Sequence, residues 1–191
     1  FHFIFPPLTL GMGLLIVINE TLYLKTDKEI YKNISKFLVK IFALIFAIGV
    51  STGIVLEFSF GTNWSTYSRM VGDIFGAPLA AEGILAFFLE SVFIGVLLFG
   101  RDRVSKKVYW LSAFLVFFGS HLSGLWIIIA NSWMQTPAGF VIEGGRAVLT
   151  DFFAAAVNYS TAQRFFHTIV GGWQSGALFL AGISAWYIIK Q

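Results

Sequence analysis

Five apolar segments, each of more than 20 residues, follow one another along the chain, and short polar connections separate them. A helix that crosses a bilayer needs roughly 20 mostly apolar residues. The alternation of apolar and polar positions over about ten residues that marks outer-membrane strands does not occur in the sequence. The pattern therefore predicts an all-α, polytopic membrane helical bundle with transmembrane spans at about 2–24, 37–58, 78–100, 108–131 and 165–189.

The composition supports this prediction and narrows the chemistry. Of the 191 residues, 57% are hydrophobic and 12% are charged, which is half the charged share of about 25% in soluble domains. A soluble enzyme and a disordered chain are both excluded, because too few polar side chains remain to cover a water-exposed surface. The chain has no cysteine, which excludes disulfides, iron–sulfur clusters and thiolate metal sites and leaves His, Met and carboxylates as haem ligands.

The basic residues orient the predicted spans. Ten of the 13 Lys and Arg residues fall in the first connection, in the third connection or after the fifth span. The positive-inside rule makes these segments cytoplasmic, so the N-terminus lies outside and the C-terminus inside. The net charge of +3 is then explained by topology and does not indicate nucleic-acid binding. We also expect a short interfacial helix within residues 26–40.

Ionisable side chains inside spans are costly and mark candidate functional sites. His2 and His167 both lie near the outer end of a span, and His121 lies deeper, in the fourth span. An imidazole at such a position ligates haem iron, carries protons or hydrogen-bonds a neighbouring helix, and position alone leaves these three roles open. Because the histidines near span ends lie on the outer side, we expect the chemistry there.

The third span carries two carboxyl groups, Glu82 and Glu90. On a regular α-helix they are about 12 Å apart along the axis and roughly 80° apart around it. This spacing suits a proton relay that includes Ser91 and Ser123. The alternative is two neutral carboxyls that hydrogen-bond neighbouring helices. Glu20, near the inner end of the first span, is expected to form an ion pair with Lys25 or a neighbouring loop.

Several motifs closely resemble subunit I of the cytochrome bd-type quinol oxidases of bacteria and archaea. The resemblance runs through nearly the whole chain, and the long motif around Glu82 in the third span is the most specific part. The stretches that carry it are His2-Phe-Ile-Phe-Pro-Pro-Leu-Thr-Leu-Gly-Met12, Gly61-Thr-Asn-Trp64, Val71-Gly-Asp-Ile-Phe-Gly-Ala-Pro-Leu-Ala-Ala-Glu82-Gly, Ala86-Phe-Phe-Leu-Glu90-Ser91, Leu122-Ser-Gly-Leu-Trp-Ile-Ile-Ile-Ala-Asn131-Ser-Trp-Met-Gln135 and Phe166-His167-Thr168.

The resemblance implies the N-terminal five-helix part, residues 1–191, of a nine-helix subunit in a prokaryotic cell membrane. It implies an oxidase that couples quinol oxidation to reduction of dioxygen to water and generates a proton gradient. The implied cofactors are low-spin haem b558, high-spin haem b595 and haem d. The implied partners are oxidase subunit II, a small single-span subunit and the C-terminal remainder of subunit I.

The resemblance also assigns roles to residues. His2 matches an axial ligand of one of the two high-spin haems, and His167 matches a ligand of the low-spin haem b. Glu82 matches a glutamate beside the high-spin haems, while Glu90 and Ser91 match the upstream proton path and Ser123 resembles a later element of it. His121 receives no role.

Further haem ligands and the quinol-binding loop are expected downstream, so residues 1–191 alone are not expected to oxidise quinol. The alternatives are a non-catalytic haem-binding membrane anchor or truncated paralogue, and a proton channel on the face that carries Glu82 and Glu90.

Overall fold

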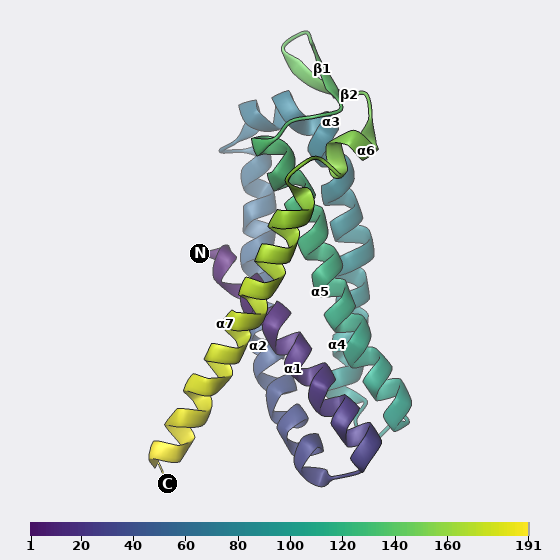
Figure 1. The fold of residues 1–191 in the computed structure, drawn as a ribbon, viewed down its shortest axis with the longest axis vertical. Helices are drawn as coiled ribbons and strands as arrows, with labels where there is room; N and C mark the ends of the chain where they lie inside the picture. Colours follow the sequence, from purple (N-terminus) through teal and green to yellow (C-terminus); the bar gives the residue numbers. More distant parts are fainter. Residues whose placement is uncertain (191) are drawn as a thin grey trace.

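Long helices, roughly side by side, make up most of the chain in the computed structural model, which describes residues 1–190 and all their side chains except those of Leu85 and Ala86 (Figure 1). The elements in chain order are η1 (His2–Ile4), α1 (Phe5–Thr26), α2 (Glu29–Gly61), α3 (Ser65–Ala81), η2 (Glu82–Phe87), α4 (Phe88–Phe99), α5 (Lys106–Gln135), β1 (Phe140–Glu143), β2 (Arg146–Leu149), α6 (Phe152–Ala156) and α7 (Thr161–Lys190).

Four helical runs are long and apolar enough to cross a bilayer, namely His2–Thr26, Glu29–Gly61, Ser65–Phe99 and Lys106–Gln135. The fifth predicted span, 165–189, lies within α7, whose 30 residues extend about 45 Å. α7 is less apolar because Trp173, Gln174 and several glycines interrupt its apolar residues. The prediction of an all-α membrane helical bundle is confirmed.

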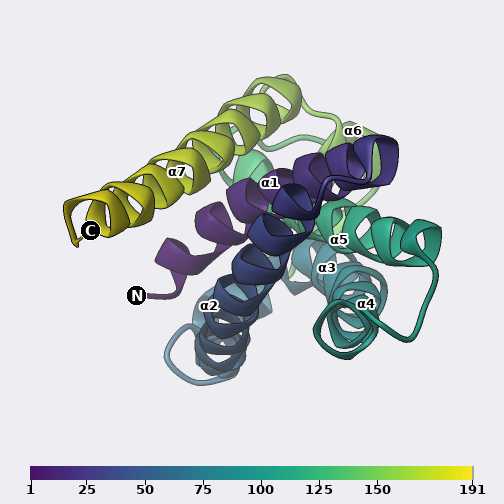
Figure 2. The same cartoon turned by 90° about the horizontal axis from the view of Figure 1, so that it is seen from below.

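Helix α1 lies at the centre of the described bundle, with contacts to α2, α5 and α7. Figure 2 shows α1 running diagonally beside α7 and across α2. Glycines allow the backbones of α1 and α7 to touch, because a Cβ atom on Gly11 would lie 2.5 Å from the Gly172 carbonyl oxygen and 2.6 Å from the Gly176 Cα atom. Such small-residue crossings are a common way for membrane helices to pack.

The third predicted span is the end of a longer helical run. This run begins at Ser65, 13 residues before the predicted start, and continues through α3, η2 and α4 to Phe99. Pro78 lies inside α3 and cannot donate a backbone hydrogen bond to the preceding turn. The segment η2, Glu82–Phe87, is π-helical, a rare form that occurs mostly as short insertions in α-helices and frequently at functional sites.

The expected interfacial helix within residues 26–40 is not a separate element. Helix α1 ends at Thr26, and Asp27 adopts a left-handed conformation with φ of 57°, which turns the chain within two residues. Helix α2 then begins at Glu29 and continues without a break to Gly61. Lys32, Lys36 and Lys40 therefore lie on the first turns of α2, whereas Lys25 lies on the last turn of α1.

A small cap covers one end of the bundle and was not predicted from the sequence. Strands β1 and β2 form an antiparallel hairpin that is seated on α3, where the Leu149 amide donates to the Asp73 carboxylate at 2.7 Å. Ala147 is buried together with Phe75 and Trp133. This cap lies at the end of the bundle opposite the α1–α2 and α4–α5 connections (Figure 1).

Candidate functional site

The predicted relay residues Glu82 and Ser123 are in direct contact. The Ser123 hydroxyl, on α5, donates to the Glu82 carboxylate at 2.9 Å, although the residues are 41 positions apart in the sequence. Glu82 is the first residue of the π-helical segment. The contact therefore fixes this carboxyl at the junction between α3, η2 and α5.

Glu90 is buried on the same side of the third span. Its side chain is 9% exposed, and the Ser120 hydroxyl, also on α5, lies beside its carboxyl. The sequence suggested an offset of roughly 80° between Glu82 and Glu90. A π-helical turn holds more residues than an α-helical turn, so each residue of η2 advances less around the axis. Both carboxyls consequently face α5, one beside Ser123 and the other beside Ser120.

Ser91 follows Glu90 and is also enclosed. Its hydroxyl oxygen is buried and has no hydrogen-bond partner within the part of the chain that the structure describes. The indole nitrogen of Trp126, on α5, is also buried and has no hydrogen-bond partner among the described residues. Buried polar groups in proteins are generally satisfied by a protein atom or an ordered water. Ser91, next to Glu90, thus has unused hydrogen-bonding capacity.

His2 is held against α2 by one ring nitrogen. His2 Nδ1 lies 3.0 Å from the Thr52 hydroxyl oxygen, and that hydroxyl can donate to the Ile48 or Gly49 carbonyl at 2.9 or 3.0 Å. When the hydroxyl donates to either carbonyl, the Thr52 oxygen accepts from the His2 Nδ1–H group, and this is the tautomer that we assign to the ring. A Cβ atom on Gly53 would lie 3.1 Å from His2 Cε1, so the absence of a side chain there leaves room for the ring.

This arrangement fits an iron ligand. Histidines that bind metals usually donate the hydrogen of their second ring nitrogen to a neighbour, which fixes the tautomer. The Nε2 atom of His2 is the unprotonated nitrogen, and within residues 1–190 it makes no hydrogen bond to another side chain or the backbone. His2 is partly buried in η1 at the start of the first span.

His167 is exposed on one face of α7. It lines an open depression of about 460 Å³ together with Tyr159, Ser160, Gln163 and Arg164. Among the described residues no hydrogen bond engages its imidazole ring, in contrast to His2 and His121. The ring is therefore free to bind a group that lies against this face.

His121 is engaged at both ring nitrogens. Its Nδ1 lies 2.7 Å from the Phe117 carbonyl oxygen, one turn earlier on α5, and its Nε2 accepts from the Trp173 indole N–H at 3.0 Å. These contacts fix the neutral ring with the proton on Nδ1 and join α5 to α7. With both nitrogens occupied, His121 is not available to bind a metal.

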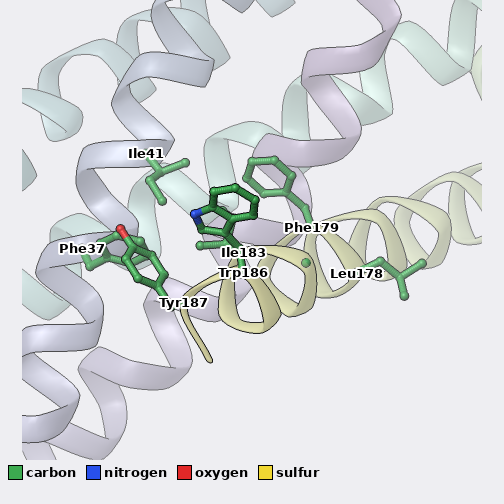
Figure 3. Close-up of a pocket in the computed structure, with 8 residues that line it drawn as sticks. Phe37, Ile41, Leu178, Phe179, Ile183, Trp186 and Tyr187 are labelled. Carbon is green, nitrogen blue, oxygen red and sulfur yellow. The ribbon is translucent and has the colours of Figure 1, made fainter. Parts of the chain in front are cut away.

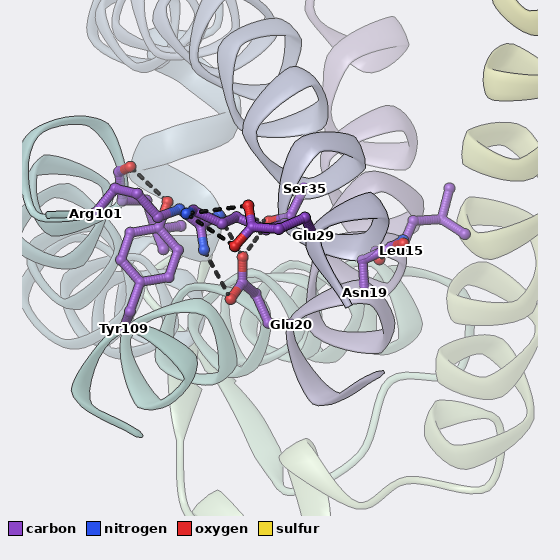
Figure 4. Close-up of polar contacts among 9 residues, drawn as sticks. Leu15, Asn19, Glu20, Glu29, Ser35, Arg101 and Tyr109 are labelled. Atoms are coloured by element: carbon purple, nitrogen blue, oxygen red, sulfur yellow. Dashed lines mark hydrogen bonds and ion pairs between the residues drawn. The ribbon is translucent and has the colours of Figure 1, made fainter. Parts of the chain in front are cut away.

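Glu20 forms a buried polar cluster between helices (Figure 4). Its side chain is 1% exposed and accepts two hydrogen bonds from the Arg101 guanidinium group and one from the Ser35 hydroxyl. The guanidinium carbon also lies 3.8 Å from the centre of the Tyr109 ring. Glu20 had been expected to pair with Lys25 or a neighbouring loop, and the loop supplies its partner.

A second depression is apolar and open. It lies between α2 and the C-terminal half of α7, has a volume of about 560 Å³, and places the Phe37 and Tyr187 rings edge to face (Figure 3). Ile41, Phe179, Ile183 and Trp186 line the remainder. No charged side chain lines this groove, so its lining offers packing surface without acid–base groups.

The structure thus brings Glu82 together with Ser123 but leaves His2 and His167 at separate positions. His2 lies in η1 against α2, and His167 lies on an exposed face of α7. No group of three or more His, Asp or Glu residues that could hold a bare metal ion occurs among the described residues. Sequence reasoning did not single out Thr52, Ser120 or Trp173, because each contacts a residue on another helix that is at least 30 positions away in the sequence. Only their polarity inside apolar spans could have drawn attention to them.

Comparison with known proteins gives a consistent result. A family model described as "Cytochrome bd terminal oxidase subunit I" matches residues 1–191. The chain is 50% identical over 192 residues to cytochrome bd-II ubiquinol oxidase subunit 1 of Escherichia coli (strain K12). It is 49% identical over 191 residues to cytochrome bd ubiquinol oxidase subunit 1 of Bacillus subtilis (strain 168). Both alignments cover 100% of this chain, and 37% and 41% of the relatives.

The fold is also similar to a solved structure. The bd oxidase from Geobacillus thermodenitrificans matches with a TM-score of 0.92 and 28% sequence identity, over 98% of this chain and 43% of that chain. The chain therefore spans about two fifths of the length of the relatives that it matches.

Proposed function

The chain belongs to the cytochrome bd terminal oxidase subunit I family, and on this premise we propose that it is the haem-binding N-terminal part of a membrane quinol oxidase. The proposed enzyme oxidises quinol, reduces dioxygen to water and generates a proton gradient in aerobic respiration. The observation that carries the proposal is the family match over residues 1–191, with about half of the residues identical to two ubiquinol oxidase subunits. The rest of subunit I is part of the proposed enzyme.

The proposed cofactors are low-spin haem b, high-spin haem b and haem d, which supply one-electron carriers between quinol and dioxygen when bound. His2 is assigned to a high-spin haem and His167 to the low-spin haem b. For His2, support comes from the hydrogen bond to Thr52, which leaves Nε2 as the basic nitrogen. For His167, support comes from its unengaged ring beside an open depression.

Glu90, Ser91, Glu82 and Ser123 are assigned to the proton path. A buried carboxyl of Glu90 can accept a proton from the cytoplasmic side and release it toward Glu82, because both groups face α5. The Ser123 hydroxyl holds the Glu82 carboxyl in place and can exchange a proton with it. Proton transfer between groups of this kind requires hydrogen-bonded neighbours or a water between them.

The proposed complex contains oxidase subunit II and a small single-span subunit, and it lies in a prokaryotic cell membrane with the N-terminus outside and the haem sites toward the outer face. The arrangement of the basic segments supports this orientation. The α1–α2 connection, the α4–α5 connection and the C-terminal end of α7 lie at one end of the bundle (Figure 1). Ten of the 13 Lys and Arg residues lie in these segments or on the helix turns next to them.

A reduced-minus-oxidised optical spectrum of membranes that contain the complete subunit and its partner tests the proposal. We expect b-type bands together with a red-shifted chlorin band, and oxygen uptake on addition of quinol. A spectrum with b-type bands and no quinol-driven oxygen uptake would identify a haem-binding anchor instead. A spectrum without haem would contradict the proposal and favour a proton channel.

The proton-path assignment predicts that Glu90→Gln in the complete enzyme slows quinol-driven oxygen reduction at least about tenfold, since a positioned proton donor contributes roughly 100-fold or more to such steps. The haem spectrum should remain close to wild type, because glutamine has the shape of glutamate and can still hydrogen-bond Ser120. Glu143→Gln, on the exposed hairpin, is the matched control. A wild-type turnover rate in the Glu90 variant would assign Glu90 to helix packing.

A further inference from the structure

Arg164 and His167 share one face at the start of α7. They are three residues apart, a spacing that places side chains next to each other on a helix, and both line the depression of about 460 Å³. Arg164 lies one turn nearer to Thr161, the first residue of α7. A group bound to the His167 ring therefore has Arg164 as its cationic neighbour on the side of the helix start.

The guanidinium group of Arg164 is oriented by neutral partners. Its Nε donates to the Ser160 hydroxyl at 3.1 Å, and a terminal nitrogen donates to the Gln135 side-chain oxygen at 2.5 Å. Ser160 is itself fixed by the buried Asn158, because the Ser160 backbone amide donates to the Asn158 side-chain oxygen at 3.1 Å. The side chain is therefore held in place before any ligand binds.

The positive charge of Arg164 is not neutralised within residues 1–190. The ion pairs in this part of the chain are Lys32–Glu29, Arg101–Glu20 and Lys106–Asp27, and none involves Arg164. Arginine is well suited to carboxylates, because its planar group can donate two parallel hydrogen bonds. An ordered guanidinium group with no ion-pair partner, beside an open depression, is suited to bind an anionic group of a molecule that occupies the depression.

The chemistry of haem supplies such a group. Its macrocycle is apolar except for one edge, which carries two propionate carboxylates. After His167 the helix continues into the apolar bundle with buried Ile169, whereas the polar residues Ser160, Gln163 and Arg164 precede His167. The propionate edge of the haem is therefore expected to face these polar residues, away from the apolar bundle. Resting on the proposed function, we propose that Arg164 binds a propionate of the haem that His167 ligates and thereby raises its reduction potential.

An equilibrium redox titration of the low-spin haem in the purified complete oxidase tests this proposal, with Arg164→Gln, Arg164→Lys and the control Arg69→Gln. Arg69 is exposed and does not line the depression. A cation near the haem favours the ferrous form. At the potential where the wild-type haem is half reduced, we expect the ratio of reduced to oxidised haem to be about fivefold lower in Arg164→Gln. In Arg164→Lys the ratio should be close to that of the wild type, and in Arg69→Gln it should equal that of the wild type.

Other outcomes overturn the proposal. An unchanged ratio in Arg164→Gln, with haem bound, would show that Arg164 does not contact the propionate. A decrease that appears in vesicles of anionic phosphatidylglycerol but not in zwitterionic phosphatidylcholine would assign Arg164 to the headgroup of an anionic lipid. If Arg164→Gln does not assemble, a wild-type potential together with lower haem content in Arg164→Lys would indicate a structural role. Absence of low-spin haem from the wild type would instead contradict the proposed function itself.

Discussion

His167→Ala in the complete subunit is expected to remove the low-spin haem b while the rest of the subunit still assembles. The imidazole supplies the bond to iron in this assignment, and alanine has no atom that can replace it. The His167 ring is exposed and forms no hydrogen bond within the described residues. Its loss should therefore change the stability of the helix bundle by no more than about 0.5 kcal/mol. The measurement is the reduced-minus-oxidised spectrum, with the rate of haem reduction by quinol.

His121→Gln provides the matched control, because it changes a histidine of the same bundle that is engaged at both nitrogens. It should retain the low-spin haem spectrum and lose the contact between α5 and Trp173, at a cost of about 1 kcal/mol. An unchanged spectrum in His167→Ala would refute the assignment of His167. Loss of the haem in both variants would indicate general unfolding.

Arg101→Met is expected to destabilise the subunit by about 3–5 kcal/mol, because it leaves the buried Glu20 carboxylate without its charged partner. Glu20 is 1% exposed, and Arg101 supplies two of its hydrogen bonds while Ser35 supplies another. The cluster joins α1, α2 and the loop before α5 (Figure 4). Thermal unfolding of the purified protein in detergent, followed by loss of helical circular dichroism, measures the effect.

Two comparisons make this prediction specific. The Lys106–Asp27 pair also joins the α1–α2 turn to the start of α5, but both side chains are largely exposed, so Lys106→Met should leave the unfolding midpoint unchanged. The double variant Glu20→Met/Arg101→Met removes both charges and should recover most of the lost stability. A single Arg101→Met variant as stable as wild type would show that water or lipid compensates Glu20.

The helical bundle followed from the sequence because the membrane imposes a local rule. In an apolar medium each backbone N–H and C=O group must be paired within its own segment, so an apolar run of sufficient length becomes a helix. The ranges 108–131 and 165–189 lie wholly within α5 and α7, and 78–100 ends one residue beyond α4. The predicted ends were less accurate. Helix α3 begins 13 residues before the predicted span, because a helix can continue through polar residues beyond the apolar interior of the membrane.

The candidate residues were also found by a local signal, the cost of polar groups inside apolar spans. That signal identified His2, His167, Glu82 and Glu90, and the motifs around them indicated the family. It did not determine their partners. Thr52 beside His2, Ser120 beside Glu90 and Trp173 beside His121 each belong to another helix and are at least 30 positions away in the sequence.

The amino-acid sequence was enough to identify the membrane helices, the family and the side chains that are too polar for their surroundings. The directions and partners of those side chains depend on how the helices pack. The π-helical segment turned Glu82 and Glu90 toward α5, Arg101 rather than Lys25 neutralised Glu20, and Trp173 occupied His121. The physical reason is that helix formation depends on neighbours along the chain, whereas burial and pairing depend on which faces pack together.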